Sequence, residues 1–311
     1  PASRGTSLFS GFLQGDVRLA DDRLHLSAGT KLEHSAYTGF EYQPGARLLW
    51  TPTPRQVLWL AASQALRTPA RADQDVRLNL LAVAADSLFP GSPLALGTGF
   101  GSRDFRSERL RAFELGYRAR PADPLLLDVA TFYNRYLDLR AGEPALPYLE
   151  TEPEPAHLVA PFYAANLATA TTYGLELAAD WRLAADRLRL RAAYSLLQLD
   201  IHLAPGADPR SASPEGESPE HQLYLWSALT PRPDLQLDAV LRHVAALPSL
   251  DTDAYTVVDA RAAWEPVPRL ELSLVARNLL SRHHPEFRAF FVDTIPTQTQ
   301  HEIVLALRWR T

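Results

Sequence analysis

The sequence predicts an all-β protein, an antiparallel transmembrane β-barrel, from three observations. About thirteen runs alternate apolar and polar residues, with the period of two that is typical of β-strands. The links between these runs alternate between tight and long. No run of about 18 apolar residues exists, so the sequence offers no transmembrane helix. Short turns on one side and long loops on the other are typical of outer-membrane barrels.

The tight links are rich in Pro, Asp and Arg, as in ADDR at 20–23 and PVPR at 266–269. The others of this kind are PTPR at 52–55, PADP at 121–124, AADR at 184–187 and PRPD at 231–234. Most of the remaining links are long, at 72–107, 142–161, 204–219 and 282–296. This asymmetry predicts hairpins whose tight turns all lie at one end of the barrel.

Alternation is clearest in the segments 24–33, 173–182, 187–196, 270–280 and 302–310. A soluble β-sandwich would also alternate, with its polar face in water. Two features favour the barrel. Strands of roughly 10 to 16 residues exceed the usual 5 or 6. Aromatic residues also gather near strand ends, as an interfacial girdle requires: Tyr42, Trp50, Tyr117, Trp181, Trp264 and Trp309.

Composition excludes several classes of function. The net charge of −5 gives no bulk argument for nucleic-acid binding. The absence of cysteine removes disulfides, thiolate metal sites and cysteine nucleophiles. Residues from Pro1 onward lack a charged segment followed by an apolar segment, so the sequence predicts no secretory signal within residues 1–311. Since an odd number of antiparallel strands cannot close, we expect residues 1–311 to form the C-terminal portion of a barrel domain, with no plug domain.

Eight segments resemble one family, in the order that the family shows. They include WLAASQALRTPAR at 59–71, FRSERLRAFELGYR at 105–118, FYNRYLDL at 132–139 and TYGLELAADW at 172–181. The others lie at 31–52, 193–200, 218–225 and 270–287. The chain thereby resembles the C-terminal part of the barrel of TonB-dependent outer-membrane receptors. Members of this family carry a barrel of about 22 strands, plugged by an N-terminal domain.

The resemblance implies TonB-dependent active transport of a scarce solute across the outer membrane of a Gram-negative bacterium. The solute would be a ferric siderophore, a similar chelate or cobalamin. The implied partners are outer-membrane lipids, the protein's own plug domain, and the TonB–ExbB–ExbD complex acting through an N-terminal box. Two alternatives stay open: a passive porin-like channel and a soluble β-rich interaction module.

The resemblance also implies two sets of functional residues. Ligand contacts are expected on the extracellular loops, from aromatic and charged side chains: Arg71, Phe100, Arg103, Asp104, Phe105, Tyr148, His157 and Tyr163. Charged residues on the polar faces of the strands are expected to line the lumen and face the plug: Glu176, Asp180, Arg189, Arg242, Asp259, Arg261, Glu271 and Arg277.

The sequence predicts no enzyme, no catalytic residues, no cofactor and no metal site. His283 and His284, with Glu286, could suggest metal ligands. Adjacent histidines on an extended strand point to opposite faces, which makes a joint grip on one ion poor. The segment GTGFG at 97–101 lacks the spacing of a dinucleotide fingerprint and its βαβ setting, so we predict a flexible loop there.

Overall fold

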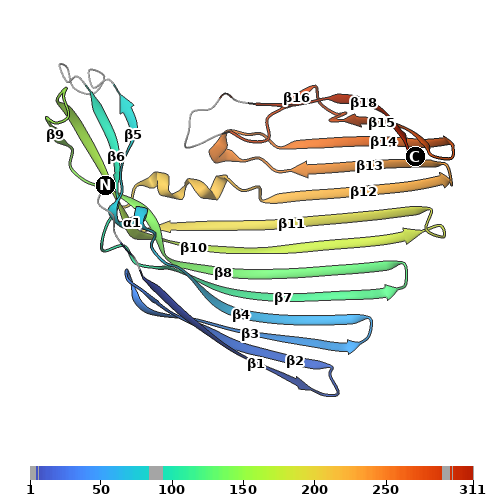
Figure 1. Cartoon of the computed structure of the whole chain (residues 1–311), viewed down its shortest axis with the longest axis horizontal. Coiled ribbons are helices and arrows are strands. Elements are labelled where there is room, and N and C mark those ends of the chain that lie inside the picture. Colours follow the sequence, from blue (N-terminus) through green and yellow to red (C-terminus); the bar gives the residue numbers. More distant parts are fainter. Residues whose placement is uncertain (1–4, 6, 84–93, 289–294, 296, 311) are drawn as a thin grey trace.

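One curved sheet makes up most of the chain (Figure 1). The computed structural model describes residues 5, 7–83, 94–288, 295 and 297–310. Three of the 16 strands of the sheet lie off its main path, which leaves thirteen strands that neighbour one another in sequence order. The predicted count of about thirteen is therefore confirmed within the described residues. None of the described helices is long and apolar enough to cross a membrane.

Strands of the main path are antiparallel throughout. They are β1 (Leu8–Leu19), β2 (Leu24–Ser35), β3 (Gly39–Thr53), β4 (Gln56–Arg67), β7 (Glu108–Ala122), β8 (Leu125–Pro144), β10 (His157–Leu183), β11 (Leu188–Leu203), β12 (His221–Arg232), β13 (Leu235–Val244), β14 (Tyr255–Val267), β15 (Leu270–Arg277) and β18 (Glu302–Trp309). No pairing joins β1 to β18 among the described residues. These residues thus form an open barrel wall.

Strand lengths depart from the prediction at both extremes. β10 has 27 residues and β8 has 20, so both continue well beyond the membrane core of about 30 Å. The predicted loop at 142–161 is therefore wrong at both ends, since β8 reaches Pro144 and β10 begins at His157. The predicted strand at 270–280 ends early, because Asn278 has a left-handed φ of 52°.

The predicted long loop at 72–107 contains secondary structure of its own. It holds α1 (Arg71–Asp75), β5 (Arg77–Val83) and β6 (Ala95–Phe100). β6 runs parallel to the first part of β10, and β9 (Tyr148–Glu150) pairs antiparallel with the same part. These strands form an extension at the end opposite the tight turns (Figure 1). The flexible loop predicted at 97–101 is thus wrong, since most of it is strand.

Two other long links contain short elements. The link at 204–219 holds the 3₁₀ helix η2 (Pro209–Gly216). The link at 282–296 begins with β16 (His283–His284), which pairs with β17 (Thr299–Gln300). A further 3₁₀ helix, η3 (Pro248–Leu250), joins β13 to β14. Residues 289–294 and 296 lie outside the described residues.

All the predicted tight turns are confirmed, and Figure 1 shows them together at one end of the sheet. A ladder of backbone bonds joins neighbouring turns. The N–H of Thr51 donates to the carbonyl of Arg23 at 2.7 Å. Equivalent bonds join Arg120 to Arg55, Arg182 to Pro124, Thr230 to Arg187, Glu265 to Asp234 and Arg310 to Arg269. The ladder satisfies backbone groups that strand ends would otherwise leave unpaired.

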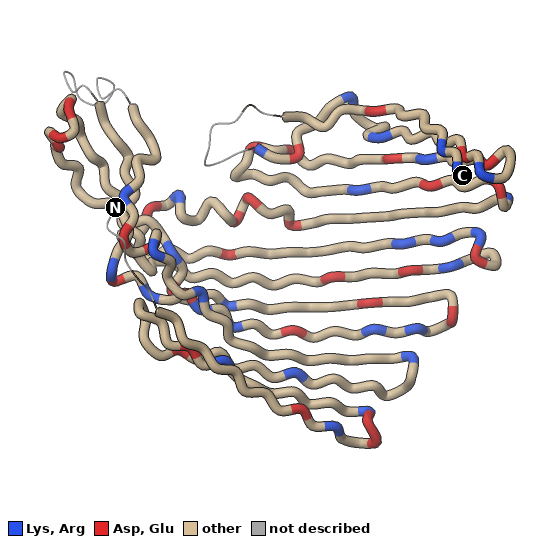
Figure 2. Tube along the Cα trace, in the orientation of Figure 1, with Lys and Arg blue, Asp and Glu red and all other residues tan. Residues whose placement is uncertain are grey.

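The two faces of the sheet differ in chemistry because side chains alternate along each strand. On one face, large apolar side chains are exposed, such as Leu60 (51%), Leu115 (53%) and Leu274 (47%). The other face carries most charged side chains of the strands. Figure 2 shows charged residues gathered at the tight-turn end and again near the base of the extension. An apolar face this extensive needs lipid or protein to cover it.

Five predicted girdle aromatics lie on the apolar face near the tight turns. Trp50, Tyr117, Trp181, Trp264 and Trp309 lie on β3, β7, β10, β14 and β18, which are every second strand of the main path from β3 onward except β12. Their exposed fractions run from 37% to 61%. Tyr42 lies on the same face of β3 toward the opposite end. The nine-residue span from Tyr42 to Trp50 matches the length of a strand tilted across a bilayer.

Candidate functional site

Four residues of the predicted ligand-binding set come together on the extension: Phe100, Tyr148, His157 and Tyr163. Phe100 of β6 stacks on Tyr163 of β10, with ring centroids 5.3 Å apart and planes at 24°. The parallel register of β6 and β10 places the two residues opposite one another. The Arg77 guanidinium carbon lies 5.5 Å from the Phe100 ring centre. The result is a partly exposed aromatic surface with a cation above one ring.

A charged clasp holds this surface together. Both guanidinium ends of Arg77 donate to the carboxylate of Glu150, one at 2.9 Å. The buried His157 lies 3.1 Å from the same carboxylate through Nε2, and 2.9 Å from the Pro155 carbonyl through Nδ1. The hydrogen bond from Arg77 is the main cause that lowers the pKa of Glu150 below its ordinary value of 4.5. β5 is thereby tied to β9 and β10.

The other predicted contacts lie around α1. Arg71 sits on the exposed side of α1, and Asp104 is exposed in the link to β7. Arg103 is 80% exposed and its Nε lies 4.0 Å from the carboxylate of Asp75. Phe105 is only 2% exposed, so its ring packs inside the base of the extension. The expectation that Phe105 contacts a ligand therefore does not fit this structure. Tyr148, on β9, is 40% exposed and beside the clasp.

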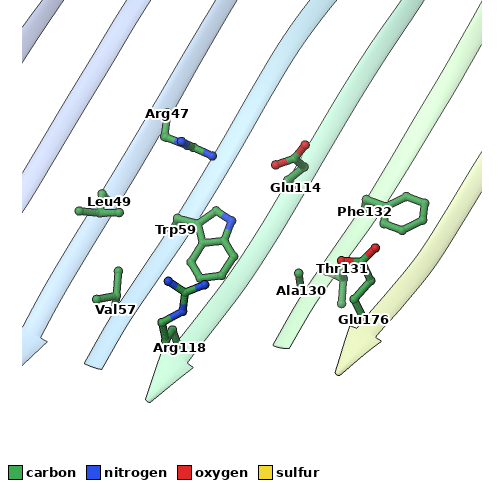
Figure 3. A pocket seen from close by; sticks show the side chains of 10 residues that line it. All are labelled: Arg47, Leu49, Val57, Trp59, Glu114, Arg118, Ala130, Thr131, Phe132 and Glu176. Atoms are coloured by element: carbon green, nitrogen blue, oxygen red, sulfur yellow. The ribbon is translucent and has the colours of Figure 1, made fainter. Parts of the chain in front are cut away.

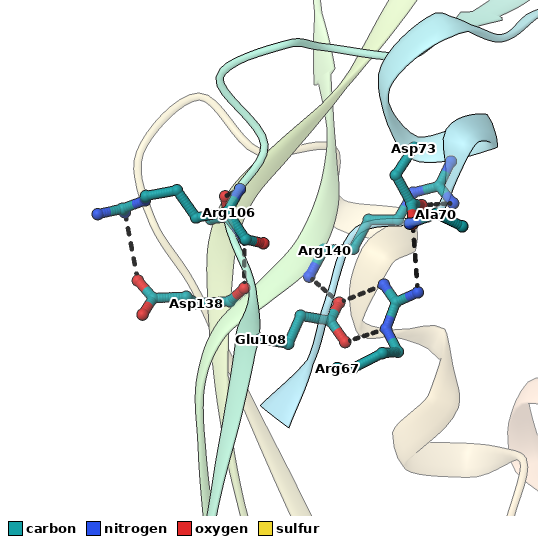
Figure 4. Close-up of polar contacts among 8 residues, drawn as sticks. Arg67, Ala70, Asp73, Arg106, Glu108, Asp138 and Arg140 are labelled. Atoms are coloured by element: carbon teal, nitrogen blue, oxygen red, sulfur yellow. Dashed lines mark hydrogen bonds and ion pairs between the residues drawn. The ribbon is translucent and has the colours of Figure 1, made fainter. Parts of the chain in front are cut away.

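An ion-pair network fixes the base of the extension to the ends of β4, β7 and β8 (Figure 4). Arg67 donates to both oxygens of Glu108, at 2.6 and 2.9 Å. Asp73 of α1 is 3% exposed and accepts from Arg140 at 3.1 Å, from Arg67 at 3.4 Å and from the Ala70 N–H at 2.9 Å. Buried charge is tolerated here because each carboxylate has several donors.

All eight predicted lumenal residues share one face of the sheet, as their registers show. Several pair with one another or with neighbours on that face. Asp180 accepts from Arg189 at 2.9 Å and from Arg191 at 2.7 Å. Arg261 bridges Asp238 at 3.0 Å and Glu271 at 3.2 Å. Arg277 lies 2.7 Å from Glu302, and Asp259 accepts from the Asn278 N–H at 2.9 Å.

Glu176 and Arg242 differ from the rest of this set. Neither has an ion pair or a side-chain hydrogen bond within the described part of the chain. Glu176 instead lines two hollows on the charged face. One, of about 510 Å³, also involves Arg47, Trp59, Glu114 and Phe132 (Figure 3). The other, of about 700 Å³, reaches Arg242 and Tyr255. These polar groups are therefore available to a further molecule.

Sequence reasoning missed Arg77, Glu150 and the network around Asp73. The role of Arg77 was missed because the sequence predicted a single long loop at 72–107. The run RLNLLAV at 77–83, followed by the glycines of 97–101, was a weak signal for a hairpin. Nothing local connects Glu150 with Arg77, since 73 positions separate them. Among the described residues, no group of three or more His, Asp or Glu could hold a metal ion.

Comparison with known families gives a decisive result for this open, two-faced sheet. Residues 2–279 match the family described as TonB dependent receptor-like, beta-barrel. The chain belongs to this family. It is accordingly an outer-membrane protein, whose exposed apolar face lies against lipid. The resemblance drawn from the sequence motifs is confirmed.

Solved structures show the same fold at low sequence identity. The ferric enterobactin receptor from Pseudomonas aeruginosa, in complex with enterobactin, matches with a TM-score of 0.65 and 17% identity over 96% of this chain and 45% of that chain. The FrpB iron transporter from Neisseria meningitidis matches at 0.66 and 14%, over 98% and 46%. The siderophore receptor PirA from Acinetobacter baumannii matches at 0.65 and 11%, over 89% and 42%.

This chain spans less than half the length of each of those structures. No curated protein sequence matches it significantly.

Proposed function

We propose that this chain is the C-terminal portion of the barrel domain of a TonB-dependent transporter. The transporter takes up a scarce ferric siderophore or similar chelate across the outer membrane. Family membership supports active uptake in general terms. The similar solved structures, which are siderophore receptors and an iron transporter, support an iron chelate as the solute. No covalent chemistry is needed for this role.

The observation that carries the choice of solute is the Phe100–Tyr163 stack with Arg77 above it. The stack stands on an extension beyond the membrane core, at the end that carries the long loops. In outer-membrane barrels this end faces the outside. A ferric catecholate chelate is anionic and exposes flat aromatic rings, so it suits ring stacking and a nearby guanidinium. Tyr148, exposed on β9 beside the clasp, extends the same surface.

The charged face would form the lumen and contact a plug domain. Most of its ion pairs are satisfied within the barrel wall, so they stabilise the wall itself. Of the eight predicted lumenal residues, Glu176 and Arg242 have no such pair within the described part of the chain, and we assign plug contacts to them first. TonB, with ExbB and ExbD, would then act on the plug through its N-terminal box, opening a path along this polar face.

Two other functions predict different behaviour. A cobalamin receptor would use the same barrel and the same energy source, but would select a corrinoid ring. A passive porin-like channel would conduct without TonB. The exposed apolar face argues against a soluble β-rich module, because water would meet many large apolar side chains.

Radioactive uptake separates these functions. The natural gene that contains this sequence would be expressed in cells with and without TonB, and supplied with ⁵⁵Fe-enterobactin or radiolabelled cobalamin. We expect ferric-chelate uptake that requires TonB. Uptake that persists without TonB would indicate a porin. Uptake of cobalamin alone would reassign the solute.

Substitution at the stack tests the surface itself. The double substitution Phe100→Ala and Tyr163→Ala should weaken ferric-chelate binding by about tenfold or more. Stacking of a ligand ring on an aromatic side chain contributes roughly 1–3 kcal/mol to the binding free energy. Leu146→Ala is the matched control, because Leu146 is 89% exposed near the same surface but has no ring or charge. Equal binding by the double variant and the control would contradict the assignment.

A further inference from the structure

A pair of arginines faces lipid near the outer end of the barrel wall. Arg111 of β7 and Arg135 of β8 are direct partners in the antiparallel register. They share a face with Phe113 and Tyr133, the partner pair one side-chain row closer to the tight turns. Both of those rings are exposed on the apolar face, 50% and 47% respectively. The two arginines therefore point outward, away from the lumen.

An aromatic row marks the depth of this pair in the membrane. Phe113, Tyr133 and Tyr173 lie in register across β7, β8 and β10. On β10, Tyr173 and Trp181 bound a nine-residue stretch whose lipid-facing residues are all apolar, and nine residues is the length of a tilted membrane strand. Tyr173 thus marks the boundary opposite the tight turns. Arg111 and Arg135 lie just beyond it, at the level of the polar headgroups of the outer leaflet.

The two charges lack a protein counter-ion. Register partners lie about 4.5–5.5 Å apart between Cα atoms, and like charges placed directly opposite are destabilising. Within the described residues, Arg135 has no hydrogen bond or ion pair. Arg111 only donates through Nε to Gln64, at 3.4 Å. Both side chains are exposed.

The nearby carboxylates do not supply the missing charge. Asp138 already pairs with Arg109 at 2.6 Å and with Arg106 at 3.3 Å. Glu108 is held by Arg67. Asp200 stands in the same row as Arg135, but β10 lies between them, so the two strands are about 10 Å apart. An anion from outside the protein would complete the site.

We propose that Arg111 and Arg135 bind a phosphate group of lipid A, the phosphorylated lipid of the outer leaflet. Guanidinium groups match phosphate oxygens in paired hydrogen bonds. The exposed rings of Phe113, Tyr133 and Tyr173 contact the acyl chains just below the headgroup. Gln64, which donates to the Tyr42 carbonyl at 3.2 Å, orients the Arg111 guanidinium from β4. The site is independent of the transported solute.

Titration with purified lipids tests the proposal. The natural gene product, purified from outer membranes and freed of lipid, would be titrated in detergent with bis-phosphorylated lipid A and with dephosphorylated lipid A, using native mass spectrometry. We expect dephosphorylated lipid A to bind at least about tenfold more weakly. The double variant R111Q/R135Q should lose about tenfold or more for the phosphorylated lipid, and R111K/R135K should lose less.

The matched control is R55Q/R232Q, which removes two exposed arginines from the tight-turn end. It should bind lipid A as the unaltered protein does. Electrophoresis with and without heating verifies that each variant is folded, and R135Q alone replaces any double variant that fails to fold. Equal binding by folded R111Q/R135Q and the control would overturn the proposal. Complete displacement by millimolar inorganic phosphate would also overturn it, because the site would then be one for free anions.

Discussion

At the scale of single residues, Glu150 holds together the strands that carry the aromatic surface of Phe100 and Tyr163. Its carboxylate accepts hydrogen bonds from Arg77 of β5 and lies within hydrogen-bonding distance of His157 on β10. β5 and β9 are short, so they have few ladder bonds of their own. The clasp therefore contributes more to order here than it would within a long hairpin.

The clasp should open in acid. The folded-state pKa of Glu150 lies below 4.5, chiefly because of the Arg77 hydrogen bond. A lowered pKa means that the stabilisation is present above pH 4.5 and is lost as the pH falls through the folded value. A spin label on Leu80→Cys, unique in a chain with no cysteine, should stay immobile from about pH 7 down to pH 4.5 and become mobile as the pH falls further, through the lowered pKa of Glu150.

Glu150→Gln is the control for this titration, because it removes the charge at every pH. The label on that variant should be mobile throughout. A label that stays immobile down to about pH 2.5 in the unaltered protein would show that the clasp does not order the extension.

Gly116 shows a second residue-scale constraint, on the charged face. A Cβ at this position would lie 1.9 Å from the Trp59 ring. The Trp59 ring therefore packs against the backbone of β7 at Gly116. Figure 3 shows Trp59 among the residues that line the hollow. We expect Gly116→Ala to lower the unfolding free energy by about 1–3 kcal/mol through overpacking. Urea unfolding in liposomes measures this.

A double-mutant cycle identifies the cause of that loss. In a Trp59→Leu background the overpacking is removed, so Gly116→Ala should leave the unfolding free energy almost unchanged. A similar cost in both backgrounds would mean that the alanine acts through the backbone instead.

At the scale of elements, the tight turns fall into two structural groups. The turns at 20–23 and 184–187 each contain three consecutive residues of positive φ, from 51° to 66°. The four proline-containing turns have at most one residue of positive φ, Arg269 at 76°, and all four carry a register shift in the strand that enters them. Proline lacks an N–H and fixes φ, so it favours a bulge over a left-handed turn.

The left-handed turns should tolerate glycine better than alanine. Ala185 has φ 51°, a conformation that costs an L-residue roughly 1–2 kcal/mol. Ala185→Gly should therefore raise the unfolding free energy by about 1 kcal/mol. The control, Ala193→Gly within β11, should lower it by about 0.5–1 kcal/mol. Equal effects at both sites would show that the turn is not strained.

At the scale of the whole molecule, the sheet separates two environments. Its apolar face meets lipid, and its charged face carries ion pairs between neighbouring strands. Each strand contributes to both faces through simple alternation, so one residue step changes the environment of a side chain completely. The stability of the wall therefore depends strongly on which face receives a charge.

Neighbouring residues of β10 test this separation. Leu177 is 38% exposed on the apolar face, whereas Ala178 lines the hollow on the charged face. We expect Leu177→Arg to lower the unfolding free energy by about 2–4 kcal/mol, the penalty for an arginine at the membrane midplane. Ala178→Arg should change stability far less. Folding into liposomes at graded urea concentrations measures both, and equal costs would contradict the assignment of the faces.

Sequence alone determined the hairpin plan of this protein. The period of two located the strands and their faces, because each strand must match its pattern to lipid on one side. The Pro, Asp and Arg turns located one end of the sheet. Dispersed motifs such as those at 105–118 and 132–139 were enough to indicate the family. All of these signals are local, within one strand or one turn.

Only the tertiary structure decided what stands at the other end. The extension of β5, β6 and β9, the Arg77–Glu150 clasp and the network around Asp73 join residues far apart in the sequence. The parallel pairing of β6 with β10 has no local signature, since it depends on where a long loop returns. The outward pairing of Arg111 with Arg135 likewise depends on the register between β7 and β8. Alternation fixes the face of each side chain, but only pairing fixes its neighbour.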